Sequence, residues 1–159
     1  MRGIALDRAR EFLAQKRIAV VGISRDEKDF SRQVLRALVK AGYEVVPVNP
    51  ALDVAEGKAC FPHVQDVKPP VNAALLLTPP TQTEEVVRDC ARAGVRYVWM
   101  HRGMGVGAAS AEAVRYCDAH GISVVTDLCP FMVLPETGFP HALHAWARTR
   151  FGKARLEHA

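Results

Sequence analysis

Several features are missing from this chain, and each absence excludes a class of protein. No apolar run approaches the roughly 20 residues that a helix needs to cross a bilayer, so we expect no membrane span. The amino-terminal stretch MRGIALDRAREFLAQK contains acids and lacks the apolar centre of a signal peptide, which predicts a cytoplasmic protein. Lysine and arginine form no block, so nothing in the charge pattern requires nucleic acid.

Metal-binding and redox patterns are missing as well. The four cysteines have no C-x-x-C spacing, which argues against a zinc knuckle and a redox pair: Cys60, Cys90, Cys117 and Cys129. We expect Cys90 and Cys117 to be buried on apolar helix faces, in a reducing compartment. His141 and His144 lie on an expected last helix over residues 141–151, but no acidic third ligand accompanies them. We therefore expect no metal site.

The composition is that of one ordinary globular domain. The 159 residues are 49% hydrophobic and 24% charged, with a formal net charge of +4. A chain of this length buries a core of its own and needs no disulfide staples. We find no repeat, linker or low-complexity tract and predict a single domain over residues 1–159.

The clearest local signal is a strand, a helix and a second strand between residues 17 and 50. The apolar β-branched run at 18–21 is typical of a strand buried on both faces, and Gly22 then opens a polar loop. Ser31 is the expected N-cap of a helix with apolar residues on one face, namely Val34, Leu35, Leu38 and Val39. Gly42 ends that helix, and 43–48 is the second strand.

Three more strands are expected at 71–77, 96–100 and 122–126, with helices between them. Residues 51–70 contain glycine and three prolines, and we expect them to be irregular apart from one helical turn near 63–67. Alternating strands and helices predict an α/β fold, a Rossmann-like doubly wound parallel sheet of five strands with helices on both faces. The expected strand order is 3-2-1-4-5, and all five strand-end loops converge on one edge.

The first turn of this fold is a candidate site for an anionic ligand. It would bring a glycine, a serine and a helix N-terminus to the carboxyl end of the first strand. The row after Gly22 has no second or third glycine, and the second strand ends at Asn49-Pro50 without an acid to hold a ribose. Both features weigh against NAD. From the residues alone, Gly22 and Ser31 could equally serve as a tight turn and a cap.

Five short blocks together resemble a known family. They are Gly22-Ile23-Ser24, Val46-Pro47-Val48-Asn49-Pro50, Leu77-Thr78-Pro79-Pro80, Val98-Trp99-Met100 and Asp127-Leu128-Cys129-Pro130. In order and spacing they resemble the small stand-alone CoA-binding domain proteins, which are similar to the N-terminal CoA-binding domain of the succinyl-CoA synthetase α subunit. The resemblance covers residues 10–135 and implies that coenzyme A, or an acyl-CoA, is the ligand.

The resemblance also implies which positions hold the ligand. The loop after the first strand would border the phosphates, Asn49-Pro50 would frame the nucleotide, and the T-P-P segment would line its other side. The cations near the helix start suit the 3′-phosphate and the pyrophosphate of CoA. The expected ligand contacts are Gly22, Ile23, Ser24, Arg25, Lys28, Ser31, Arg32, Val48, Asn49, Pro50, Thr78, Pro79, Pro80 and His101.

No catalytic constellation is evident in the sequence. His101 either contacts the thiol-bearing arm of the ligand or is a surface histidine, and Cys129 has no histidine base at a fixed spacing. Asp127 is either a base or the cap of a turn. The catalytic domains of the synthetases are absent from this stretch, so we expect no ligase activity. Two alternatives remain at this point: a small NAD(P)-binding oxidoreductase, and a regulatory module whose CoA occupancy is sensed by a protein partner.

Overall fold

The computed structural model describes residues 2–101 and 107–134. The helices are α1 (Arg2–Leu13), α2 (Phe30–Lys40), α3 (Pro80–Arg92) and α4 (Ala111–Ala119), with 3-10 turns η1 (Val64–Asp66) and η2 (Pro130–Met132). The strands are β1 (Arg17–Val21), β2 (Glu44–Val48), β3 (Val54–Ala55), β4 (Lys58–Ala59), β5 (Ala73–Leu76), β6 (Tyr97–Met100) and β7 (Ser123–Val125). The helix expected over 141–151, with His141 and His144, lies outside the described residues.

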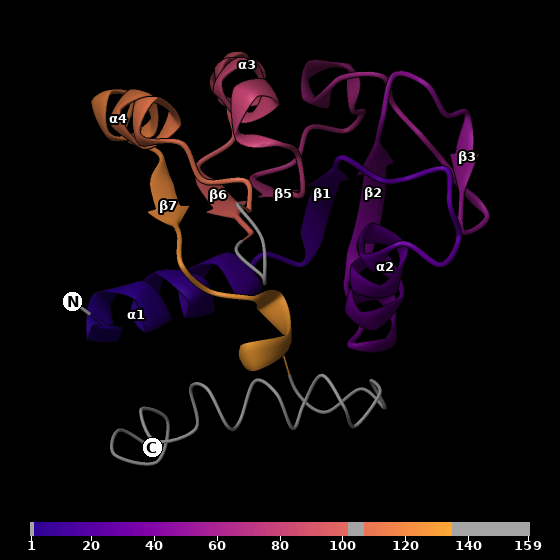
Figure 1. Ribbon diagram of the computed structural model, residues 1–159, viewed down its shortest axis with the longest axis horizontal. Helices are drawn as coiled ribbons and strands as arrows, with labels where there is room; N and C mark the ends of the chain where they lie inside the picture. The colour runs from indigo at the N-terminus through magenta and orange to yellow at the C-terminus, as the bar shows by residue number, and fades with distance from the viewer. Residues whose placement is uncertain (1, 102–106, 135–159) are drawn as a thin grey trace.

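The fold is a three-layer α/β arrangement around one parallel sheet. Five strands pair in the order β2-β1-β5-β6-β7, and every pair is parallel. Helices α3 and α4 cover one face, and α1 and α2 cover the other (Figure 1). Alternate residues of β1 enter the two cores, with Ile18 and Val20 on the α1–α2 side and Ala19 and Val21 on the α3–α4 side. The predicted fold class is confirmed.

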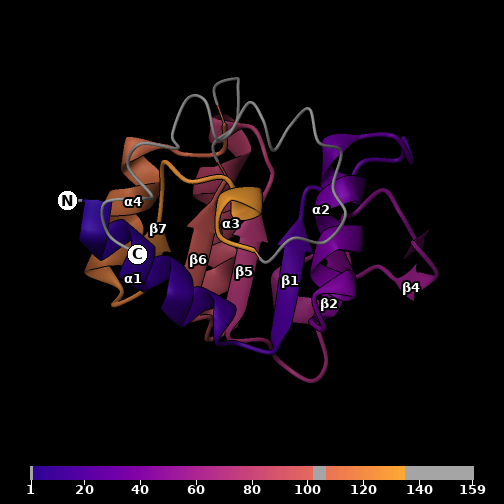
Figure 2. The ribbon, with the colours of Figure 1, turned by 90° about the horizontal axis from the view of Figure 1, so that it is seen from below.

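The predicted strand order, however, is wrong. The third long strand, β5, pairs directly with β1, so the order is 2-1-3-4-5 when the five long strands are counted along the chain (Figure 2). Pro47 supplies the physical reason, because its carbonyl accepts a hydrogen bond from the Phe61 N–H on the side away from β1. Because a proline has no N–H to donate on that side, β2 is better suited to the edge of the sheet than to its centre.

The connection from β2 to β5 is more ordered than expected. It forms a two-stranded antiparallel hairpin of β3 and β4, joined by Glu56 and Gly57 at φ of 50° and 72°. Two residues with positive φ are the requirement of a tight hairpin turn. The helical turn expected near residues 63–67 is present as η1. Phe61 forms a parallel bridge with Val48, so the connection follows the outer side of β2 before it returns to the sheet.

Two cysteines lie where the sequence predicts them. Cys90 and Cys117 are fully buried between the sheet and the α3–α4 layer, and burial raises the pKa of Cys117 to about 12. Within residues 2–101 and 107–134, no helix is long and apolar enough to cross a bilayer. The same residues contain no group of three or more His, Cys, Asp or Glu side chains that could hold a metal ion.

Gly22 lies where β1, β2 and β5 end together. Its N–H donates to the Val48 carbonyl at 3.2 Å, and its φ is 94°. A Cβ at this position would lie 3.0 Å from the Leu77 carbonyl carbon and 3.2 Å from the Thr78 methyl carbon. Both the backbone conformation and the space therefore require glycine.

Replacing Gly22 should destabilise the fold more than replacing another glycine of the same conformation. Gly42 is the control, because its φ is 96° but an added Cβ would meet nothing within 4 Å. Gly42→Ala should lower the free energy of unfolding by about 1 kcal/mol, through backbone strain alone. Gly22→Ala adds a clash with backbone atoms and should cost about 2–4 kcal/mol. Urea unfolding measures both values, and equal losses would show that the contact with Leu77 adds no strain.

Candidate functional site at the carboxyl edge of the sheet

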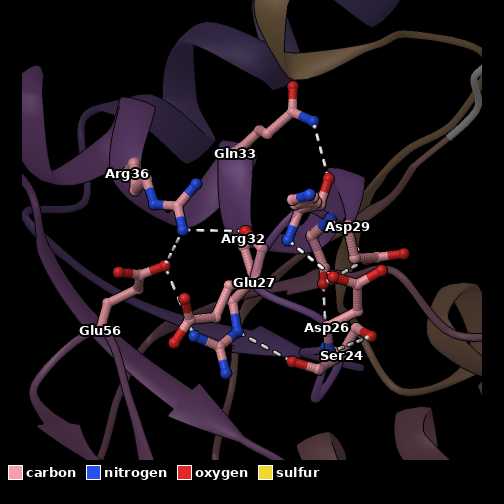
Figure 3. A network of polar contacts seen from close by, with 10 residues as sticks. Ser24, Asp26, Glu27, Asp29, Arg32, Gln33, Arg36 and Glu56 are labelled. Atoms are coloured by element: carbon pink, nitrogen blue, oxygen red, sulfur yellow. Dashed lines mark hydrogen bonds and ion pairs between the residues drawn. The ribbon is translucent and has the colours of Figure 1, made fainter.

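The loop between β1 and α2 is held closed by its own polar groups (Figure 3). The Ser24 N–H donates to Ser31 Oγ at 2.9 Å, and Ser24 Oγ accepts from the Asp26 N–H at 3.1 Å. Asp26 Oδ1 in turn accepts from the Lys28 N–H at 2.9 Å. These short-range bonds satisfy polar groups that would otherwise need water or a ligand, so the loop has a defined shape without one.

The first turn of α2 is capped by the chain itself. Asp29, not Ser31, is the N-cap, and its Oδ1 accepts from the Ser31 N–H at 2.8 Å and the Ser31 hydroxyl at 2.5 Å. The expectation of a Ser31 cap is wrong by two residues, because Ser31 Oγ is used to accept from the Ser24 N–H. A carboxylate already lies at the positive end of this helix, where a phosphate was expected to bind.

Arg32 is a structural cation. Its side chain is 6% exposed, and its Nε donates to the Ser24 carbonyl at 2.8 Å. Glu56 of the β3–β4 hairpin accepts from Arg32 at 3.4 Å and from Arg36 at 2.5 Å (Figure 3). Arg36 also donates to the Glu27 carbonyl at 2.8 Å. One carboxylate therefore joins the hairpin to α2, and both arginines hold carbonyls of the β1–α2 loop.

Arg25 and Lys28 are exposed cations in the same loop. Arg25 donates to the Ala51 carbonyl at 3.4 Å and so reaches from the loop after β1 to the loop after β2. Neither side chain forms an ion pair with a carboxylate in the described part of the chain. They are the two predicted cations that remain available to an anion from solvent.

Asn49 ties the loop after β2 to the loop after β1. Its Nδ2 donates to the Ile23 carbonyl at 2.5 Å, and its Oδ1 accepts from the Ala51 N–H at 2.7 Å. Asn49 is half-buried, and Pro50 beside it is exposed. The asparagine thus shapes the edge, and it leaves no negative charge at the end of β2 that would repel a phosphate.

The T-P-P segment turns the chain from β5 into α3. Thr78 is buried and its hydroxyl lies 2.8 Å from the Thr83 hydroxyl, which donates to the Pro79 carbonyl at 3.1 Å. Pro79 is exposed and Pro80 half-buried. The threonine is therefore part of the helix start, while the two prolines form the outward surface between the loops after β1 and β6.

His101 follows β6 and packs against the start of α2. Its N–H donates to the Leu76 carbonyl at 3.1 Å, and its carbonyl accepts from the Ala108 N–H at 2.7 Å. The ring lies 4.8 Å from the Phe30 ring at an interplanar angle of 31°, and Phe30 makes an edge contact with Phe131 at 5.6 Å. Nδ1 is buried without a hydrogen-bond partner among the described residues, and burial lowers the His101 pKa to about 4.

The structure brings the fourteen expected residues to one edge but exposes them unequally. The exposed ones are Arg25, Lys28, Pro50 and Pro79, and the half-buried ones are Gly22, Ser24, Asn49, Pro80 and His101. The buried ones are Ile23, Ser31, Arg32, Val48 and Thr78. Their side chains belong to the core or to the polar network, so their role at this edge is to hold the loops in place.

Four residues that shape this edge were missed by sequence reasoning. Asp29 caps α2, Glu56 holds Arg32 and Arg36, Phe30 packs against His101, and Phe131 packs against Phe30. A signal was available for Glu56, because Glu-Gly between two short alternating runs indicates a tight hairpin. The aromatic cluster had no local signal, since its three members lie on different elements.

Cys129 and Asp127 lie beyond β7 at the same edge. Burial raises the pKa of Cys129 to about 11, with a smaller opposing effect from the Phe131 backbone, so the thiol stays protonated at neutral pH. Asp127 has a φ of 61°, and its Oδ2 accepts from the Thr126 hydroxyl at 3.3 Å. A protonated thiol is a poor nucleophile, and Cys129 is packed against the core on the α1–α2 side of the sheet.

Comparisons with known proteins agree on one family. A family model described as CoA binding domain matches residues 16–135. The uncharacterized protein YneT of Bacillus subtilis (strain 168) is 30% identical over 114 residues, which cover 72% of this chain and 82% of YneT. The solved structure of a hypothetical protein from Pyrococcus horikoshii OT3 matches with a TM-score of 0.74 and 29% identity, over 80% of this chain and 88% of that one.

A longer relative shares only part of its length. The ADP-forming acetate–CoA ligase of Methanocaldococcus jannaschii is 26% identical over 81 residues, which are 51% of this chain but 12% of the ligase. The resemblance read from the five sequence blocks is confirmed by the family match and by this relative. The likeness reaches one small region of the ligase and leaves the rest of that enzyme without a counterpart here.

Removing the Glu56 carboxylate should loosen the link between the hairpin and α2. Glu56→Gln leaves the buried Arg32 without its counter-charge and should lower the free energy of unfolding by about 1–3 kcal/mol. Glu44→Gln is the control, because Glu44 is 68% exposed and pairs with Arg17 at the surface. That change should cost less than about 1 kcal/mol. Urea unfolding compares the two, and equal small losses would mean that the Glu56 contacts add nothing to stability.

His101 should make the protein less stable in mild acid. The unfolded chain takes up the histidine proton near pH 6.5, whereas the folded chain takes it up only near pH 4. The His101 contribution is therefore complete above about pH 6.5 and is lost as the pH falls toward 4. In urea unfolding at pH 5 and pH 7, His101→Phe should lose less stability on acidification than the wild type. An unchanged difference between the two pH values would contradict the low pKa.

Proposed function

Because this chain belongs to the CoA-binding domain family, we propose that it binds coenzyme A or an acyl-CoA across the carboxyl ends of β1, β2 and β5. The nucleotide phosphates would lie beside the loop Gly22–Asp29. The adenosine would lie toward Asn49 and Pro50, and Pro79 and Pro80 at the start of α3 would border the path of the pantetheine arm.

The observation that carries this proposal is the state of the cations in the β1–α2 loop. Arg25 and Lys28 are exposed at the carboxyl edge, and neither is paired with a carboxylate of the described chain. Exposed, unpaired cations on a loop of defined shape are suited to charge-assisted bonds with phosphate oxygens. Arg25 already spans the loops after β1 and β2, which is where the phosphorylated ribose of CoA is proposed to lie.

Two carboxylates near the first turn of α2 restrict where the phosphates of CoA can bind. The Asp29 carboxylate caps α2, and the Glu56 carboxylate is shared between Arg32 and Arg36. A phosphate placed against the first turn of α2 would meet a carboxylate of the same sign. We therefore place the phosphates farther out, at Arg25 and Lys28, with Arg32 as support for the loop.

We propose binding, and not acyl-CoA ligation, as the activity. The chain corresponds to 12% of the acetate–CoA ligase that it resembles. Two side chains at the edge with nucleophilic or basic potential are Cys129, whose thiol stays protonated at neutral pH, and His101, a half-buried imidazole with a lowered pKa. We therefore propose that the chain carries the bound CoA, or that a protein partner senses whether CoA is bound.

Calorimetric titration of the full chain with CoA, acetyl-CoA, NAD and NADP tests the ligand class. CoA and acetyl-CoA should bind with heat and raise the melting temperature, because a ligand that binds only the folded state stabilises it. NAD and NADP should produce neither effect. Binding of a dinucleotide in place of CoA would favour the oxidoreductase alternative and overturn the proposal.

Arg25 and Lys28 should distinguish CoA from dephospho-CoA. Arg25→Ala or Lys28→Ala should each weaken CoA binding by about tenfold, the value of one charge-assisted hydrogen bond, and dephospho-CoA binding less. Lys40→Ala is the control of equal charge change, because Lys40 is exposed at the other end of α2. Calorimetry gives the three affinities for each ligand. Equal losses for CoA and dephospho-CoA would place these cations away from the 3′-phosphate.

A further inference from the structure

The turn of the β3–β4 hairpin contains a residue that its backbone conformation does not favour. Glu56 and Gly57 occupy the two turn positions, at φ of 50° and 72°. Glycine and asparagine adopt positive φ readily in such turns, whereas a residue with a long side chain rarely does. A glutamate at the first position therefore strains the turn, which indicates that its carboxylate is needed at this place.

The Glu56 carboxylate contacts α2 and, through α2, the loop after β1. Arg32 and Arg36 lie one helical turn apart, and Glu56 Oε1 accepts from them at 3.4 Å and 2.5 Å (Figure 3). Arg32 also donates to the Ser24 carbonyl at 2.8 Å. Arg36 also donates to the Glu27 carbonyl at 2.8 Å. Each arginine thus joins the hairpin to the backbone of the loop that the phosphates are proposed to border.

A second connection joins the same loop to the segment that leads into the hairpin. Asn49 Nδ2 donates to the Ile23 carbonyl at 2.5 Å, and Arg25 donates to the Ala51 carbonyl at 3.4 Å. The hairpin lies beyond β2, at the outer end of the sheet (Figure 1 and Figure 2). Each of its strands has two residues, a length that is marginal without contacts to other elements. Its position therefore depends on α2 and on the loop after β1.

We propose that Glu56 is a positioning residue for this loop, and that through Glu56 the hairpin and the anionic ligand stabilise each other. This inference rests on the proposed function, and it adds an element of the fold whose order depends on whether CoA is bound. When the hairpin opens, Arg32 becomes a buried cation without a counter-charge and loses one of the contacts that fix its guanidinium group. A ligand that binds the ordered loop therefore favours the closed hairpin.

The sign of this coupling follows from where the phosphates lie. Phosphates at Arg25 and Lys28 leave both ion pairs of Glu56 in place, so CoA stabilises the hairpin. A phosphate that took Arg36 from Glu56 would release the hairpin instead. Because coupling between two sites is reciprocal, opening of the hairpin must weaken CoA by the same factor by which CoA disfavours opening.

Hydrogen exchange of backbone amides, followed by nuclear magnetic resonance, tests the coupling on the wild-type chain. The reporter is the Cys60 N–H, which donates to the Asp53 carbonyl at 2.8 Å across the hairpin. With CoA at about a hundred times its dissociation constant, exchange at Cys60 should slow by at least about tenfold, of the roughly hundredfold that full coupling allows. The His120 N–H, at the carboxyl end of α4, is the control and should exchange at an unchanged rate.

The possible failures of this experiment are distinguishable. Unchanged or faster exchange at Cys60 with CoA bound would overturn the inference and leave the proposed function standing. Absence of CoA binding in calorimetry would overturn the proposed function, and this inference with it.

Two variants of Glu56 separate positioning from stability. Glu56→Gln removes the charge, and Glu56→Asn removes it while favouring the backbone of the turn. Each should weaken CoA about tenfold, as expected when the ordered loop is populated in about a tenth of the molecules, and should abolish the slowing at Cys60. Glu44→Gln is the control, because Glu44 pairs with Arg17 at the amino end of β2, and it should change neither result.

Glu56→Asn is the decisive variant, because it relieves the strain of the turn and so counteracts any loss of stability. Unchanged CoA affinity in this variant would show that Glu56 has only a structural role. Slowing at Cys60 that persists in both Glu56 variants would show that CoA stabilises the hairpin without this carboxylate, which would also overturn the inference.

Discussion

The close approach of Gly22 to the backbone of Leu77 is the constraint on which the carboxyl edge depends. β1 lies between β2 and β5, so the chain leaving β1 must turn where both neighbours end. The Gly22 N–H bonds to Val48 on one side, and the Leu77 N–H bonds to Val21 on the other. A residue with a Cβ would separate these strand ends. Glycine at this turn therefore lets β1 and β5 end side by side, and the loops that follow these two strands lead into α2 and α3.

The same edge shows how the chain divides its charges between structure and recognition. Asp29 stabilises the start of α2 by accepting its N–H groups and by placing a negative charge at the positive end of the helix. Glu56 forms ion pairs with both Arg32 and Arg36. Without it, Arg32 would be a buried cation with no counter-charge. Groups used in this way have little left to offer a ligand. Of the cations predicted at this edge, Arg25 and Lys28 are exposed and have no carboxylate partner in the described part of the chain.

Local sequence patterns predicted the helices and strands well. The features that the sequence did not predict depend on contacts between segments that are distant along the chain. The five long strands and the helices between them follow from runs and periods within a few residues. The strand order does not, and Pro47 was the one local residue that indicated an edge position for β2. Arg32 and Arg25 look alike in sequence, and they differ only because the partner of Arg32, Glu56, lies 24 residues further along in a hairpin. Two residues suited to capping α2 lie two positions apart, and the bond from the Ser24 N–H to Ser31 decides between them.

The corrected strand order also changes the path available to a ligand. In the order 3-2-1-4-5, the T-P-P segment would have lain at the outer edge beyond β2, with His101 directly beside β1. In the observed order the prolines lie between the two, because β5 separates β1 from β6. Along the edge, the exposed cations and Phe30 lie in the connection from β1 to α2, the prolines follow β5, and His101 follows β6 and packs on Phe30. The path proposed for the ligand, from the cations of the β1–α2 loop past Pro79 and Pro80, depends on this order, because β5 lies next to β1.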